Sequence, residues 1–204
     1  MTERGMIFNA EMVRAILDGR KTQTRRPIKW KQTRFTEIGE REDGSKWPWS
    51  EDAEHACDFW HPCPFGAVGD RIWVREAFRV HSRATDVATL VYKASERNSW
   101  TEQTRRVPVA VCNKPATPEK WTPSLHMPRW ASRILLEITG VRVERLRSMS
   151  QDDARAEGVI AASGPMEAGL AFRELWDSIY GEESWKANPW VWVIEFKRVE
   201  GGAA

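Results

Sequence analysis

The spacing of apolar residues along the chain predicts two amphipathic helices. The first spans residues 9–18, where Asn9 can cap the start and Gly19 ends the helix. Its apolar side chains are Met12, Val13, Ile16 and Leu17. The second helix spans residues 167–180 and stops at Gly181. The side chains expected to face inward from it are Leu170, Leu175, Trp176 and Ile179.

Alternation of apolar and polar residues predicts several short strands between these helices. They are expected at 71–80, 89–94, 107–111, 133–146 with a break at Gly140, and 189–199. Ser150 and Asp153 form a capping-box pattern that starts one more short helix, which Gly158 ends. Strands interleaved with short helices, without regular strand–helix–strand alternation, favour an α+β fold. We expect a small mixed β-barrel with short helices packed on its outside.

Residues from about 30 to 65 show no sustained period. They are rich in charge, tryptophan and proline, so we interpret them as a long irregular insertion loop. The remainder of 1–200 is expected to form a single domain around it. The tail 201–204 is predicted to be disordered.

The composition is that of an ordinary globular protein. The chain has 204 residues, of which 41% are hydrophobic and 29% charged, and its net charge is +2. No apolar run is long enough to span a membrane, and the charged N-terminus does not resemble a signal peptide. Three cysteines suit a reducing compartment better than a disulfide framework. These features predict a cytoplasmic protein.

Positive charge is concentrated near the N-terminus. Between Arg14 and Arg34 there are eight Lys or Arg residues and one acid, Asp18. Such a stretch favours a phosphate or polyanion ligand, and a solvated surface is the alternative. The twelve tryptophans are either core residues or, beside arginines, platforms for nucleobases. Those in or near polar segments are Trp30, Trp47, Trp49, Trp60, Trp100 and Trp121.

Four residues of metal-binding types occur within nine positions of the expected insertion: His55, Cys57, His61 and Cys63. Zinc binds such side chains in tetrahedral sets. The ligands within each pair are separated by only one residue, which is tighter than usual zinc spacing. Chance proximity is therefore favoured, and we predict no metal and no cofactor.

Several motifs together resemble the ASCH domain family, whose fold is a PUA-like β-barrel. They are DGRKTQTRRP, GDRIWVRE, SQDDARAEG and WVIEFKRV, in that order along the chain. The segments WTPSLHMPRWASR and FRELWDSI resemble a longer branch of the family that is often found in phages and prophages. The resemblance covers most of the chain apart from roughly residues 30–62.

The resemblance implies a nucleoside or RNA as partner, because PUA-like barrels commonly bind RNA. One bacterial branch consists of amidohydrolases that remove the acetyl group from N4-acetylcytidine with a Lys, a Thr and a Glu. Those positions fall on Lys21, Thr24 and Glu157. Another branch has been described as ribonucleases. The function is therefore predicted to be hydrolysis of an N4-acylated cytidine, with a non-catalytic RNA or modified-base binding module and a ribonuclease as alternatives.

Amide hydrolysis by these residues requires a lysine that can lose its proton. Lys21 can act as a base only if neighbouring cations or burial lower its pKa. Glu157 is expected to orient substrate or shuttle a proton, and a turn at 20–26 is expected to bring Lys21 and Thr24 together. Trp130 is either a base-stacking residue or a core residue beside Met127. The residues expected to bind substrate or phosphate are Arg20, Arg25, Arg26, Arg75, Arg129 and Trp130.

Overall fold

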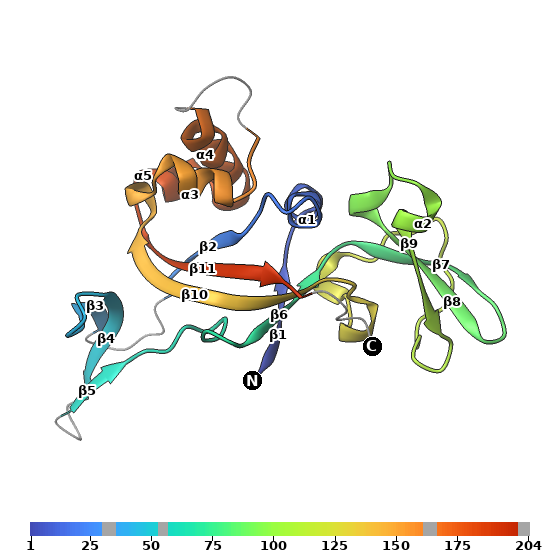
Figure 1. Cartoon of the computed structure of the whole chain (residues 1–204), viewed down its shortest axis with the longest axis horizontal. Helices are drawn as coiled ribbons and strands as arrows, with labels where there is room; N and C mark the ends of the chain where they lie inside the picture. The colour runs from blue at the N-terminus through green and yellow to red at the C-terminus, as the bar shows by residue number, and fades with distance from the viewer. Residues whose placement is uncertain (30–35, 53–56, 161–166, 200–204) are drawn as a thin grey trace. The chain divides into compact units, whose positions relative to one another are not determined.

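A computed structural model of the chain describes residues 1–29, 36–52, 57–160 and 167–199 (Figure 1). The predicted tail at 201–204 lies outside these residues. Contacts divide the chain into two compact units. Unit 1 contains Met1–Gly19, Asp70–Glu137 and the described residues from Arg198 on, and unit 2 contains the described parts of Arg20–Gly69 and Ile138–Lys197. Each unit therefore combines segments that are far apart in sequence.

Unit 1 begins with a strand that the hydrophobic pattern did not predict. Strand β1 (Glu3–Ile7) pairs in parallel with β6 (Arg71–Arg75), and the first residues of β10 (Leu135–Arg145) pair antiparallel with β6. The predicted N-terminal helix is confirmed as α1 (Ala10–Leu17). The Asn9 side chain accepts a hydrogen bond from the Met12 N–H, and Gly19 follows the helix with a φ of 74°.

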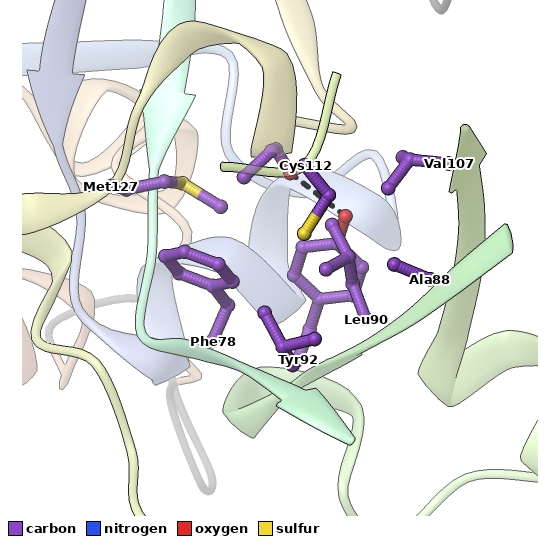
Figure 2. Packing of buried hydrophobic residues seen from close by; sticks show 9 residues of the cluster. Phe78, Ala88, Leu90, Tyr92, Val107, Cys112 and Met127 are labelled. Carbon is purple, nitrogen blue, oxygen red and sulfur yellow. Dashed lines mark hydrogen bonds between the residues drawn. The ribbon is translucent and has the colours of Figure 1, made fainter. Parts of the chain in front are cut away.

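A second sheet in unit 1 has the antiparallel order β7-β8-β9. Its strands are β7 (Phe78–Arg83), β8 (Val87–Tyr92) and β9 (Thr104–Pro108), and the short helix α2 (Trp100–Gln103) precedes β9. One face packs on a buried cluster that includes Phe78, Leu90, Tyr92, Val107, Cys112 and Met127 (Figure 2). The 3-10 turns of the chain are η1 (Lys93–Ser95), η2 (Ser124–His126), η3 (Arg129–Ala131) and η4 (Leu146–Ser148).

Unit 2 contains most of the two longest strands, β10 and β11 (Trp190–Arg198), and the whole of the shorter β2 (Gln23–Pro27). Strand β11 pairs antiparallel with β2. Three helices lie together beside these strands, α3 (Gln151–Ala156), α4 (Glu167–Tyr180) and α5 (Glu182–Lys186) (Figure 1). The core between them includes Leu146, Ala154, Ala168, Phe172, Trp176, Val191 and Val193. The capping box predicted for α3 is present, and Gly158 has a φ of 87°.

The inward face predicted for α4 is only partly right. Trp176 is buried, but Leu170 is 60% exposed and Ile179 is 43% exposed. The buried positions are Ala168, Phe172 and Trp176, which recur every four residues. The large side chain of Leu170 suggests a core residue, whereas the small Ala168 takes the buried position.

Strand β10 is continuous, so the break predicted at Gly140 is wrong. An added Cβ at this glycine would lie 2.7 Å from Oε2 of Glu195. The glycine therefore marks a close approach of the β11 side chain and does not end the strand.

The expected irregular insertion is also wrong where the structure describes it. Strands β3 (Thr36–Glu40), β4 (Lys46–Asp52) and β5 (Cys57–Trp60) form an antiparallel sheet. Pro48 lies in the central strand, where its carbonyl accepts a hydrogen bond from the His61 N–H. A proline argues against a central strand, so the sequence pattern pointed away from the observed structure.

The α+β class is confirmed, with small sheets and short helices. The strand pairings among the described residues give open sheets and no closed barrel. Within the same residues, no helix is long and apolar enough to cross a membrane.

Candidate functional site

Successive side chains of strand β2 in unit 2 point to opposite faces of the sheet. Gln23 and Arg25 point toward the face where α3 lies, since they contact Asp153 and Glu157. Thr24, between them, pairs with Ile194 on β11 and belongs to the other face. The expected turn at 20–26 is therefore wrong, because most of this segment is a strand.

Lys21 meets Glu157 although 136 residues separate them. Its ammonium donates a 2.7 Å hydrogen bond to Oε2 of Glu157 and a 2.9 Å bond to the backbone carbonyl of the same residue. The two residues also form an isolated β-bridge. The Lys21 side chain is fully buried and that of Glu157 is 2% exposed. Helix α3 ends at Ala156, so its C-terminus delivers Glu157 to this position.

Arg25 holds the second oxygen of the same carboxylate. Its Nη1 donates to Oε1 of Glu157 at 3.1 Å, and its Nη2 donates to Oε1 of Glu144 at 2.5 Å. Its guanidinium also lies 5.9 Å from the ring centre of Phe172 on α4. The Arg25 side chain is fully buried. Glu157 is thereby fixed between two cations.

A further ring of charges surrounds this group. Arg142 contacts Glu144 at 3.3 Å, Asp153 at 2.7 Å, and Glu195. Burial raises the pKa of Asp153, but hydrogen bonds from Ser150 and Gln23 and the charge of Arg25 outweigh it, and the net pKa is lowered. Asp153 therefore stays ionised and ties α3 to the strands.

Burial is the main influence on the pKa of Lys21. It lowers the pKa of the ammonium because the charged form loses its hydration. The Glu157 carboxylate raises the pKa of Lys21, whereas the charges of Arg26 and Arg25 lower it further. The net pKa lies below the ordinary value. Lys21 therefore loses its proton at a lower pH than a lysine in water does.

Thr24 is not joined to this pair. Its side chain is buried, and no hydrogen bond connects its hydroxyl to Lys21 or Glu157 among the described residues. The structure therefore brings together Lys21 and Glu157 and leaves Thr24 on the opposite strand face.

The basic stretch is less basic at the surface than its sequence suggests. Lys21 and Arg25 are buried and paired with carboxylates, and Arg26 is half-buried. Arg20 is exposed and donates to the backbone carbonyl of Gly158. Two of the eight cations between Arg14 and Arg34 are therefore neutralised by carboxylates inside unit 2.

The other expected ligand-binding residues belong to unit 1. Arg75 donates to the carbonyl of Leu125, and Arg129 pairs with Glu3 at 2.9 Å. Trp130 is half-buried and packs edge-on against Phe78. These contacts favour the core interpretation of Trp130 over base stacking.

The four residues weighed as zinc ligands, for which the sequence favours no metal, stay untested. His55 lies outside the described residues, and so does the side chain of Cys57. Cys63 is buried, and His61 Nε2 lies 2.8 Å from the Ser50 hydroxyl. No group of three metal-binding side chains occurs in the part of the chain that the structure describes.

Sequence reasoning missed most of the charged ring around Arg25. Its members Arg142, Glu144 and Glu195 lie on strands β10 and β11. Polar residues that alternate with Val141 and Val143 on a half-buried strand were the available signal. Such polar positions normally face solvent on a strand, and here they face α3.

Comparison with solved structures gives a neighbour of this chain. No protein-family model matches the chain, and the search of curated proteins finds no significant match. A structural neighbour is an ASCH domain from Lactobacillus crispatus JV V101, the family whose motifs the sequence resembles. It shares 15% identity and a TM-score of 0.41, over 97% of this chain and 79% of that one. A TM-score of this size is too low to support an inference about fold or function.

Proposed function

We propose that the protein is a hydrolase that removes an acyl group from an N4-acylated cytidine or a related modified nucleoside. The observation that carries the proposal is the buried contact between Lys21 and Glu157, 2.7 Å long. The motifs that resemble the ASCH family pair the same two positions. A lysine with a lowered pKa against a carboxylate is also the arrangement that proton transfer requires.

Hydrolysis adds one water molecule across the bond between the acyl carbon and N4. The attacking oxygen loses a proton, the carbon–nitrogen bond breaks, and the departing amino group gains a proton. Neutral Lys21 accepts the first proton, and the Lys21–Glu157 pair returns a proton to the leaving nitrogen. The products are cytidine and a free carboxylic acid, and no oxidant or reductant is consumed.

Arg25 acts in this proposal as a positioning residue. It binds the Glu157 oxygen that Lys21 does not use, and Glu144 anchors it from the other side. The carboxylate therefore cannot rotate away from Lys21 without breaking a charge-assisted hydrogen bond.

Water is the favoured nucleophile. The Thr24 hydroxyl belongs to the opposite strand face and has no hydrogen bond to Lys21 or Glu157. Thr24→Val should accordingly retain most of the turnover, and Thr24→Ser should behave like wild type. If Thr24→Val abolishes turnover while Thr24→Ser preserves it, the hydroxyl is the attacking group and the assignment to water is wrong.

The proposal is tested by incubating the purified protein with N4-acetylcytidine and measuring cytidine by chromatography. The main variant is Lys21→Met with Glu157→Gln, because removing both charges together avoids leaving one of them buried without its partner. The matched control is Lys46→Met, which removes an exposed lysine of β4 that is ion-paired with Glu40.

Wild type and Lys46→Met should release cytidine at equal rates, and the double variant should release none above the uncatalysed rate. Far-ultraviolet circular dichroism should show that all three proteins are folded. Absence of cytidine from the wild type, or equal turnover by the folded double variant, would reject the hydrolase.

A further inference from the structure

Three tryptophans lie on one face of the sheet β3-β4-β5, which is drawn in blue to cyan in Figure 1. The register places Trp49 opposite Trp60 on β5 and opposite Glu37 on β3. It also places Trp47 opposite Gly39. Residues two apart on a strand, and residues paired across antiparallel strands, share a face, so we call this side of the sheet the tryptophan face. Each of its tryptophans is half-buried, so part of each remains in contact with solvent.

Two of these indoles are fixed in place by the protein. A Cβ at Gly39 would lie 2.9 Å from Cη2 of Trp60, so the glycine of β3 leaves the space that a ring from β5 occupies. The Nε1 of Trp47 donates a 2.7 Å hydrogen bond to the carbonyl of His61. The ring of Trp47 also meets Trp192 of β11 edge-on, with ring centres 5.0 Å apart. The rings are therefore positioned before any ligand arrives, which lowers the cost of binding.

The guanidinium of Arg41 lies over both of these rings. Its central carbon is 4.0 Å from the ring centre of Trp47 and 5.3 Å from that of Trp60. A cation at these distances is attracted by the face of an indole. Within the described part of the chain, this guanidinium forms no hydrogen bond and no ion pair. The rings therefore account for its position, and the protein itself demonstrates that the tryptophan face accepts a planar cation.

Carboxylates surround this face. Residues 36–52 contain six Asp or Glu and two Lys or Arg. Glu37 and Glu51 lie on the tryptophan face by the alternation of the strands, and both are exposed. Their charge attracts cations and repels phosphate. The nucleobase-stacking role that the sequence allows for these tryptophans is therefore disfavoured, and a cationic ligand is favoured.

We propose that the tryptophan face binds an arginine side chain of a basic segment of a partner protein. The incoming guanidinium takes the place of Arg41 over Trp47 and Trp60, while Glu37 and Glu51 attract the positive charges beside it. Arginine is favoured over lysine because its planar guanidinium is more weakly hydrated and stacks on aromatic rings.

The test is fluorescence anisotropy with three labelled peptides of equal length, in which glycine alternates with arginine, with lysine or with glutamate. The arginine peptide should bind more tightly than the lysine peptide although their charges are equal, and the glutamate peptide should not bind. Trp60→Leu keeps an apolar side chain but removes the ring. It should weaken binding of the arginine peptide by about 2-fold to about 30-fold and bring it close to that of the lysine peptide.

A pair of matched variants separates the rings from the charge. Arg41→Ala removes the internal competitor and should tighten binding of the arginine peptide by about 2-fold to about 30-fold. Lys46→Ala also removes one positive charge from the sheet, but this lysine is paired with Glu40. It should therefore tighten binding less than Arg41→Ala does. For the lysine peptide the two variants should have similar effects.

The variants used here lie outside the proposed hydrolase site. Arg41→Ala, Lys46→Ala and Trp60→Leu should hydrolyse N4-acetylcytidine like the wild type, since none of them changes Lys21 or Glu157. Circular dichroism should show that all three are folded. Loss of hydrolysis in the Lys21 and Glu157 variants with intact peptide binding concerns the proposed function alone, so the two proposals fail separately.

Equal binding of the arginine and lysine peptides by the wild type would overturn the inference, because charge alone would then explain it. The same conclusion follows if the wild type does not bind the arginine peptide at low salt, or if folded Trp60→Leu binds it as well as wild type does. Equal effects of Arg41→Ala and Lys46→Ala on the arginine peptide would also overturn it. Self-association in sedimentation velocity that Arg41→Ala strengthens would identify the occupant as a second copy of the chain and exclude a separate partner.

Discussion

Replacing Glu157 by glutamine removes one negative charge from a buried site. The carboxylate accepts hydrogen bonds from Lys21 and Arg25, both of which have fully buried side chains. Arg25 keeps Glu144 and Asp153 as ionic partners after the change. Lys21 keeps only the backbone carbonyl of residue 157 as a hydrogen-bond partner of its ammonium within the described structure. The substitution therefore leaves the lysine as the unpaired buried charge.

The size of the effect follows from the proton on Lys21. The ammonium can lose its proton and so avoid the free-energy cost of an unpaired buried charge. The ordinary pKa of 10.5 lies about 3.5 units above pH 7. At about 1.4 kcal/mol per unit, deprotonation limits the loss of unfolding free energy to about 5 kcal/mol at pH 7 and about 2 kcal/mol at pH 9. The unfolded chain still binds this proton below pH 10.5, so the stability of the variant rises with pH relative to wild type.

Urea denaturation of wild type and Glu157→Gln at pH 7 and pH 9 measures this difference. The loss should be about 3–5 kcal/mol at pH 7 and smaller at pH 9. The double variant with Lys21→Met should recover most of the loss, because no buried charge is then left unpaired. A loss that is equal at both pH values, or a double variant less stable than Glu157→Gln, would show that the Lys21 charge does not govern the site.

Three further outcomes are expected. Trp176→Ala should lower the free energy of unfolding by about 3–5 kcal/mol because the indole is buried in the core of unit 2, and a near-wild-type urea curve would contradict this packing. Gly140→Ala should lower it by less than about 1 kcal/mol, because the obstructing atom is the end of the flexible Glu195 side chain; a much larger loss would mean that the backbone itself has to move. The kcat/KM for N4-acetylcytidine should rise with pH through the lowered pKa of Lys21, below its ordinary 10.5, since the neutral amine is the proton acceptor; a flat profile from pH 6 to 10 would exclude that role.

Local signals in the sequence predicted the ends of several elements. Asn9 and the Ser150–Asp153 pair act within three or four residues of a helix start, and both form the expected hydrogen bonds. Such contacts require no knowledge of the remainder of the chain. The same holds for the glycines at 19 and 158, whose positive φ values suit helix ends.

The charged site required information that no local window contains. The proximity of Lys21 to Glu157 is implied only by the family motifs. The alternation of Arg142 and Glu144 with Val141 and Val143 places both polar residues on one strand face, but it does not indicate that they pair with Arg25 and Asp153. Periodicity gives the face of a residue within its own strand, but the element that covers this face is decided by tertiary packing. The separation of Thr24 from Lys21 depends likewise on whether residues 23–27 form a strand or a turn, which a run of polar residues does not determine.

Helix α3 has only six residues, too few to be stable as an isolated helix. Asp153 in its first turn is bound by Arg142 and Gln23, and Glu157 just beyond its end is bound by Lys21 and Arg25. The helix and β2 should therefore open and close as one cooperative unit, with amide hydrogens that exchange at similar rates. Formation of the Lys21–Glu157 contact and folding of this segment are then a single event, and the protonation state of one lysine sets how often the segment opens.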